Sequence, residues 1–73
     1  MALESIRMVI AWYSKALYEE EHSASPDTDR LQILAAERRA CVRDRKVLLD
    51  AGPDEIARVG RDYSARFRSL TTD

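Results

Sequence analysis

The chain has 73 residues and carries 12 basic and 13 acidic side chains, for a formal net charge of −1. Dedicated nucleic-acid-binding domains are usually strongly basic, so this balance argues against that class while leaving room for a local basic patch. Its 45% hydrophobic and 34% charged residues are typical of a folded domain and exclude a disordered chain.

A domain of this size buries only about 60% of the surface of its unfolded chain and is marginally stable alone. One cysteine and one histidine rule out an internal disulfide and a four-ligand His/Cys zinc site. Helix packing and self-association therefore remain as sources of stability. No apolar run reaches the length of a bilayer span, and the N-terminal residues lack the pattern of a signal peptide, so we predict a cytoplasmic protein without membrane contact.

The first predicted helix covers residues 3–21. Its apolar residues recur at the three-and-four spacing of one helical face, namely Leu3, Ile6, Val9, Ile10, Tyr13, Ala16 and Leu17. Three glutamates follow at residues 19–21, where the helix dipole prefers cations. We expect them to end the helix or to face the positive start of the next one.

The second predicted helix covers residues 26–50, with Ser25 as its N-cap and Pro26 in its first position. Gly52 is expected to end it in the left-handed conformation. Apolar doublets recur along this helix every seven residues, which is the pattern of a coiled-coil or bundle seam. The doublets are Leu34-Ala35, Cys41-Val42 and Leu48-Leu49.

The third predicted helix covers residues 53–70, and the tail 71–73 is expected to fray. Gly60 lies within its apolar side and either permits a close helix approach or is simply tolerated. Short loops favour antiparallel neighbours. We therefore predict one all-α domain, residues 1–73, made of three antiparallel helices (up-down-up) with a long central helix, completed to a larger bundle by dimerisation.

The stretch ERRACVRDRK, residues 37–46, contains five basic side chains that helical geometry divides into two groups. Arg38 and Arg45 fall on the apolar seam. They either extend their charged ends to solvent, or set the helix register by pairing with a carboxylate. Candidate partners are Glu4, Glu20 and Asp62. Arg39, Arg43 and Lys46 lie on a different, solvent-facing side.

A second apolar stripe on the middle helix suggests how the protein functions. This stripe either packs against the third helix or forms an interface, and the first helix also carries surplus apolar side chains. Large apolar side chains such as Trp and Met are enriched at interface centres. We predict a protein-protein interaction module, a homodimeric adaptor or regulator with a further protein partner, whose interface residues are Met8, Trp12, Ile33, Ala36, Ala40 and Val47.

Two other functions stay open as alternatives. One is a nucleic-acid-binding regulator that uses the basic faces of helices two and three, with contacts from Arg39, Arg43, Lys46, Arg58 and Arg61. The other is a small dimeric enzyme with an arginine-lined pocket. Cys41 lies mid-helix on the apolar seam and His22 in a loop, so no catalytic pair is evident. We accordingly predict no enzymatic activity, catalytic residue, metal or cofactor.

Overall fold

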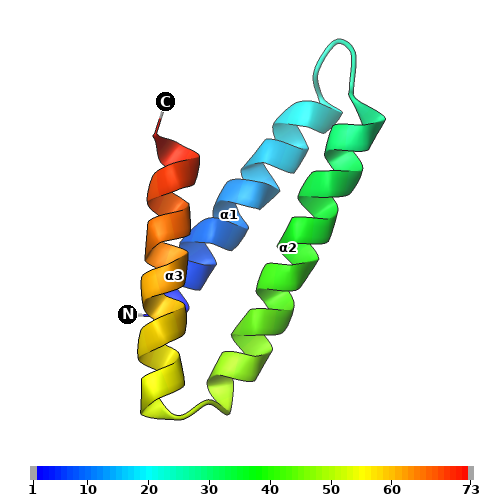
Figure 1. The fold of residues 1–73 in the computed structure, drawn as a ribbon. Helices are drawn as coiled ribbons and strands as arrows, with labels where there is room; N and C mark the ends of the chain where they lie inside the picture. Colours follow the sequence, from blue (N-terminus) through cyan, green and yellow to red (C-terminus); the bar gives the residue numbers. More distant parts are fainter. Residues whose placement is uncertain (1, 73) are drawn as a thin grey trace.

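The computed structural model describes residues 2–72 and contains three helices, α1 (Ala2–Glu21), α2 (Thr28–Leu49) and α3 (Pro53–Thr71) (Figure 1). No strand occurs among these residues. The prediction of an all-α, three-helix chain is confirmed, and each helix begins and ends within two residues of its predicted bounds.

Helix α1 is the packing centre of the fold. It packs extensively against both α2 and α3, whereas α2 and α3 barely meet. Figure 1 shows α1 running from behind the middle of α3 toward the N-terminal end of α2. The α1–α2 connection lies at one end of the molecule and the α2–α3 connection at the other. The longest helix, α2, therefore flanks the core instead of forming its centre.

The core lies along one face of α1 and draws a single stripe from α2. Its buried residues are Ala2, Ile6, Val9, Ile10, Tyr13, Leu34, Cys41, Leu48 and Tyr63. The seven-residue seam is visible here because the first member of each doublet is buried. Of the second members, Ala35 and Val42 are half-buried, while Leu49 is 67% exposed. Burial of each large apolar side chain stabilises the fold by about 1.5–3 kcal/mol.

The start of α2 differs from the prediction. Asp27, and not Ser25, is the N-cap, and its Oδ1 accepts a hydrogen bond from the Arg30 backbone N–H at 3.2 Å. Pro26 precedes the helix. Aspartate is as good an N-cap as serine. In addition, the Glu20 carboxylate accepts the Asp27 backbone N–H at 3.2 Å, which stabilises the extended conformation of Asp27.

The end of α2 also differs from the prediction. Gly52 has φ −75° and ψ 168°, and neither glycine has positive φ, so the left-handed cap predicted there is wrong. The last turn instead tightens through bonds from Asp50 N to Val47 O and from Ala51 N to Leu48 O. Gly52 then serves as N-cap of α3, with Pro53 in its first turn.

The C-terminal end of α3 lies one residue beyond its predicted bound. The helix continues to Thr71, and Thr72 is its C-cap. The Thr71 hydroxyl donates to Phe67 O at 2.9 Å, and the Thr72 hydroxyl donates to Arg68 O at 2.6 Å. These bonds satisfy two carbonyls of the last turn, which stabilises the end of the helix. Asp73 lies outside the described residues.

Gly60 lies at a close approach of α1 and α3. A Cβ placed on Gly60 would lie 3.1 Å from Ala2 Cβ and 3.2 Å from Ala2 Cα. One turn further along, the hydroxyls of Ser5 and Ser64 are 2.8 Å apart. Of the two explanations for Gly60, the structure supports close helix approach, because small residues allow the two backbones to come together.

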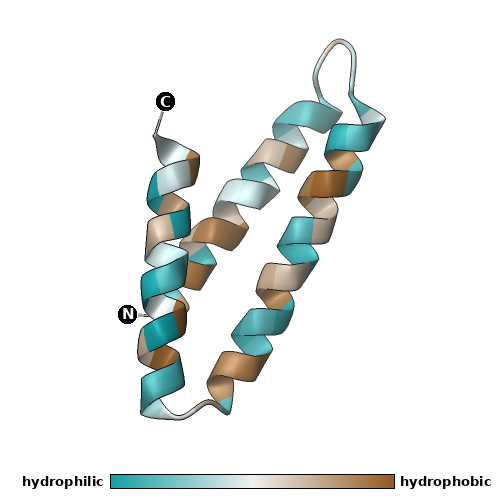
Figure 2. Cartoon of the chain, viewed as in Figure 1, coloured by the Kyte–Doolittle hydropathy of each residue, from teal (hydrophilic) through white to brown (hydrophobic). Residues whose placement is uncertain are grey.

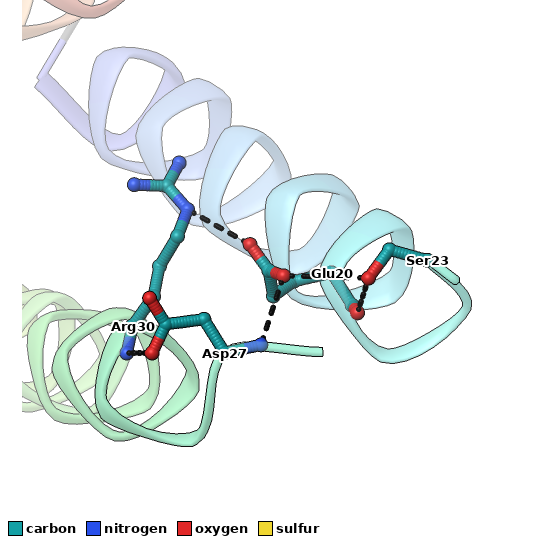
Figure 3. A network of polar contacts seen from close by, with 4 residues as sticks. All are labelled: Glu20, Ser23, Asp27 and Arg30. Atoms are coloured by element: carbon teal, nitrogen blue, oxygen red, sulfur yellow. Dashed lines mark hydrogen bonds and ion pairs between the residues drawn. The ribbon is translucent and has the colours of Figure 1, made fainter. Parts of the chain in front are cut away.

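A polar network around Glu20 fixes the connection between α1 and α2 (Figure 3). One carboxylate oxygen lies 3.1 Å from Arg30 Nε, and the other accepts the Asp27 N–H. The Ser23 hydroxyl donates to the Glu20 carbonyl at 2.9 Å. Of the three glutamates at residues 19–21, Glu20 therefore does face the positive start of α2, as the sequence suggested.

The Glu20 network gives a testable difference between neighbouring glutamates. Replacing Glu20 with alanine is expected to lower the free energy of unfolding by about 1–2 kcal/mol, because the Asp27 N–H and Arg30 lose their charged acceptor. Glu19→Ala removes a charge from an exposed neighbour outside this network and is the matched control. Urea denaturation followed by circular dichroism measures both. Equal losses would show that the network does not contribute.

Candidate functional site

The second apolar stripe of α2 is left uncovered in this structure. Ile33 is 59% exposed and Val47 is 60% exposed, Ala36 is exposed and Ala40 is half-buried. Figure 2 shows apolar bands recurring along α2 between polar ones. Helix α3 packs against α1 and does not cover this stripe. The explanation that α2 uses both stripes inside one chain therefore fails.

Two separate hollows lie beside the stripe where α2 and α3 stand apart, and together we call them the α2–α3 groove. At one end of the groove, Ile33 and Glu37 of α2 face Leu70 of α3 over Trp12 and Tyr13 of α1. At the other end, Asp44 and Val47 face α3 residues that include Glu55, Asp62, Tyr63 and Arg66. The two helices stand apart because α1 lies between them, so the groove follows directly from the packing order.

Met8 and Trp12, predicted as interface residues, occupy different surroundings. Trp12 is half-buried, packs against the core and contacts Tyr13 edge to face with ring centroids 5.2 Å apart. It also lines the groove beside Ile33, whereas Met8 is exposed and does not line this groove. The structure thus brings Trp12 close to the α2 stripe and leaves Met8 apart from it.

A polar cluster joins α2 to α3 within the groove. The Tyr63 hydroxyl donates to Asp44 Oδ2 at 2.5 Å, and Arg66 Nη1 donates to Cys41 Sγ at 3.6 Å. The Arg66 guanidinium also lies 4.9 Å from the centre of the Tyr63 ring, within cation–π range. Since α2 and α3 have few other contacts, these groups fix how far apart the two helices stand.

Burial keeps the tyrosines of this region protonated. Burial, followed by the hydrogen bond to Asp44, raises the pKa of Tyr63 well above its usual value. Burial, followed by interaction with the Glu37 carboxylate, raises the pKa of Tyr13 to about 12. Both phenols therefore keep their protons to a higher pH than an exposed tyrosine does.

The pKa of Arg66 is affected in two directions. Desolvation lowers it, but the nearby ionisable groups of Tyr63, Cys41 and Tyr13 outweigh this effect, so the pKa is raised overall. Arg66 is accordingly a fixed cation.

Cys41 is fully buried, which is typical of a structural cysteine and not of a nucleophile. The cluster is suited to hold helices in place. Among residues 2–72, no group of three or more His, Cys, Asp or Glu side chains is placed to hold a metal ion.

This cluster was missed by sequence reasoning. Neither Tyr63 nor Arg66 is among the site residues predicted above. A weak signal existed, since Arg66 follows Tyr63 by three residues and the two side chains therefore share a helix face. Nothing in the sequence indicated Asp44 as the acceptor, because it lies on another helix.

The two seam arginines meet no carboxylate among the described residues. Arg38 Nε donates to the Ser14 hydroxyl at 2.8 Å and so links α2 to α1 through a neutral acceptor. Arg45 is half-buried, without a hydrogen bond or ion pair to residues 2–72. Two of the proposed acidic partners are engaged elsewhere, Glu20 by Arg30 and Asp62 by Arg58, and Glu4 is exposed.

The basic residues proposed for nucleic-acid contact lie on separate helices. Arg39, Arg43 and Lys46 are exposed along one edge of α2, and Arg61 is exposed on α3. Arg58 lies 3.7 Å from Glu55 and 4.0 Å from Asp62, so acids of its own helix balance its charge. The exposed basic residues therefore form an edge on α2 and stand separately on α3.

Comparison of the chain with protein-family models, curated proteins and solved structures finds no match. Within residues 2–72, none of the helices is both long enough and apolar enough to cross a membrane. The function must therefore be inferred from the uncovered α2 stripe and the groove beside it.

Proposed function

We propose that this chain is a homodimeric protein-interaction module whose three helices, in an up-down-up array, are completed to a larger bundle by a second copy. The supporting observation is the uncovered α2 stripe, in which Ile33 and Val47 stay about 60% exposed in the single chain. Exposed apolar side chains that gather on one helix face mark interaction sites in small proteins.

The total accessible surface supports self-association. It is 5352 Å², whereas a folded monomer of 8.4 kDa is expected to expose about 4600 Å². The excess of about 700 Å² is close to the roughly 800 Å² that each partner buries in a standard protein-protein interface. A second copy that covered this surplus surface would bury the area of a standard interface.

The packing order indicates where the second copy docks. In a four-helix bundle each helix contacts two neighbours, and diagonal helices stand apart. Here α1 contacts both other helices while α2 and α3 barely meet, as three corners of such a bundle would. A helix from the second copy, seated in the α2–α3 groove against the stripe, would occupy the fourth corner.

The proposal is tested by two variants that replace almost equally exposed side chains of α2. Val47→Gln places an amide in the stripe and is expected to raise the dissociation constant at least tenfold, since burying a valine contributes about 1.5–3 kcal/mol and each dimer contains two. Leu49→Gln is the matched control, because Leu49 is 67% exposed on a different face. Sedimentation velocity over a range of concentrations measures both.

Two outcomes contradict the proposal. If the wild-type chain is monomeric at high micromolar concentration, self-association does not occur. If the dimer forms but Val47→Gln and Leu49→Gln weaken it equally, the α2 stripe is not its interface.

A further inference from the structure

The α2 stripe is flanked by charges of opposite sign on its two sides. At 100° per residue, Glu37 and Asp44 stack on the edge that borders the groove toward α3. Arg39, Arg43 and Lys46 lie along the other edge and are all exposed. Exceptions occur only at the ends of the helix.

These end exceptions leave the pattern intact. Arg30 begins the acidic edge, but Glu20 of α1 already pairs with it at 3.1 Å. Asp50, at the far end of the basic edge, is the C-cap residue of α2. Over the two middle turns, where Ala36 and Ala40 allow close approach, one edge is therefore acidic and the other basic.

This arrangement distinguishes the two ways in which two α2 helices can pair about a two-fold axis. When the axis runs along the helices, the pair is parallel, and the acidic edge of each copy faces the basic edge of the other. When the axis is perpendicular to them, the pair is antiparallel and like edges meet. An antiparallel pair centred near Ala40 would oppose Glu37 to Asp44 of the second copy and Arg39 to Arg43. In a parallel pair only one of these charged residues, Arg43, which follows Ala36 by seven residues, meets its own counterpart.

We propose that the dimer joins its two α2 helices in parallel, with Arg39 of each copy facing Asp44 of the other. This inference rests on the self-association proposed above and specifies its geometry. Arg39 and Asp44 are five residues apart in the chain. In a parallel pair built on the stripe, a residue on one flank of a helix meets the residue five positions later on the other flank of its partner, and such flanking positions form interhelical ion pairs. The pair occurs twice by symmetry.

The carboxylate of Asp44 is already held in a fixed orientation in the single chain. The Tyr63 hydroxyl binds Oδ2 and so fixes the orientation of the carboxylate, while no described residue donates to Oδ1. An oriented carboxylate with one oxygen available suits a guanidinium donor, because a charge-assisted hydrogen bond requires defined geometry. The polar cluster between α2 and α3 thereby orients the Asp44 carboxylate for the contact between the two copies.

Cysteine cross-linking tests the orientation directly. In a Cys41→Ala parent, Ile33→Cys and Val47→Cys are made one at a time and oxidised under mild conditions. A disulfide needs Cα atoms within about 7 Å. In a parallel dimer each position faces itself, so we expect both single variants to form covalent dimers. The parent must retain the helical content and the sedimentation behaviour of the wild type.

Other cross-linking results overturn the inference in distinct ways. A covalent dimer that appears only when the two cysteine variants are mixed shows an antiparallel pair. A dimer by sedimentation that cross-links in neither case has another interface. A monomeric wild-type chain contradicts self-association itself, and so separates failure of the proposed function from failure of this geometry.

A charge variant gives an independent measurement. Arg39→Glu places an acid beside Asp44 of the other copy twice, and we expect it to raise the dissociation constant by about tenfold at low salt. Arg7→Glu makes the same charge change on exposed α1 surface and is expected to have no effect. Because salt screens such pairs, the difference should shrink at 1 M salt. Equal affinity of the two variants at low salt would overturn the pairing.

Discussion

Replacing Ile6 with alanine is expected to remove about half of the stability of the folded chain. Ile6 is fully buried in α1, the helix that packs against both others. Large-to-small substitutions at such sites cost about 2–5 kcal/mol. A 73-residue domain has a total stability of only about 4–10 kcal/mol. Urea denaturation, followed by circular dichroism at one fixed protein concentration, should show the midpoint falling to about half of its wild-type value.

Leu3→Ala is the matched control for this experiment. Leu3 lies on the same helix and undergoes the same kind of truncation, but it is 41% exposed and stands outside the buried core. Its loss should be under about 1.5 kcal/mol, since only part of the side chain leaves water on folding. Similar losses for Leu3→Ala and Ile6→Ala would contradict a core centred on α1.

The folded chain is also expected to lose stability steeply above pH 10. The pKa of Tyr13 in the folded chain is about 12, against 10.0 for a free tyrosine, so the folded state holds the phenolic proton more tightly. This stabilisation is fully present below pH 10 and is lost as the pH rises toward 12. Two pKa units correspond to a loss on the order of 2–3 kcal/mol. The raised pKa of Tyr63 acts in the same direction.

Urea midpoints measured between pH 8 and pH 12 test this dependence. Tyr13→Phe removes one of the titrating groups and should flatten the alkaline decline, at some cost in stability at neutral pH from the lost polar contact with Glu37. Tyr18→Phe is the control, because Tyr18 is 63% exposed. An unchanged alkaline slope in Tyr13→Phe would show that Tyr13 is not the group responsible.

The helices themselves could be predicted because their signals are local. The seven-residue spacing of Leu34, Cys41 and Leu48 identified the buried side of α2 correctly, and the periodic spacing of Ile6 and Val9 did the same for α1. The packing order could not be predicted. All three helices carry apolar stripes, and nothing local indicates that α3 packs on α1 and leaves α2 open.

The polar details depend on residues that are distant in sequence. Ser25 and Asp27 are similarly good N-caps, and the Glu20 carboxylate binds Asp27 from seven residues away. The acceptor for Tyr63 lies 19 residues earlier, on another helix. Ile33 and Val47 are likewise exposed because of the packing order of the three helices. The sequence therefore allowed the stripe to be predicted as an interface, but it could not show that the stripe is exposed in the single chain.

The crossing of α1 and α3 has a consequence for the order of folding. Ser5 and Ser64 are 59 residues apart in the chain, and Ala2 contacts Gly60 across a similar separation. Contacts between such distant residues form late, because long loops close at an entropic cost. During synthesis α1 and α2 are complete well before the residues that dock α3 have been added. Until α3 docks, the side of α1 that it covers is open to solvent.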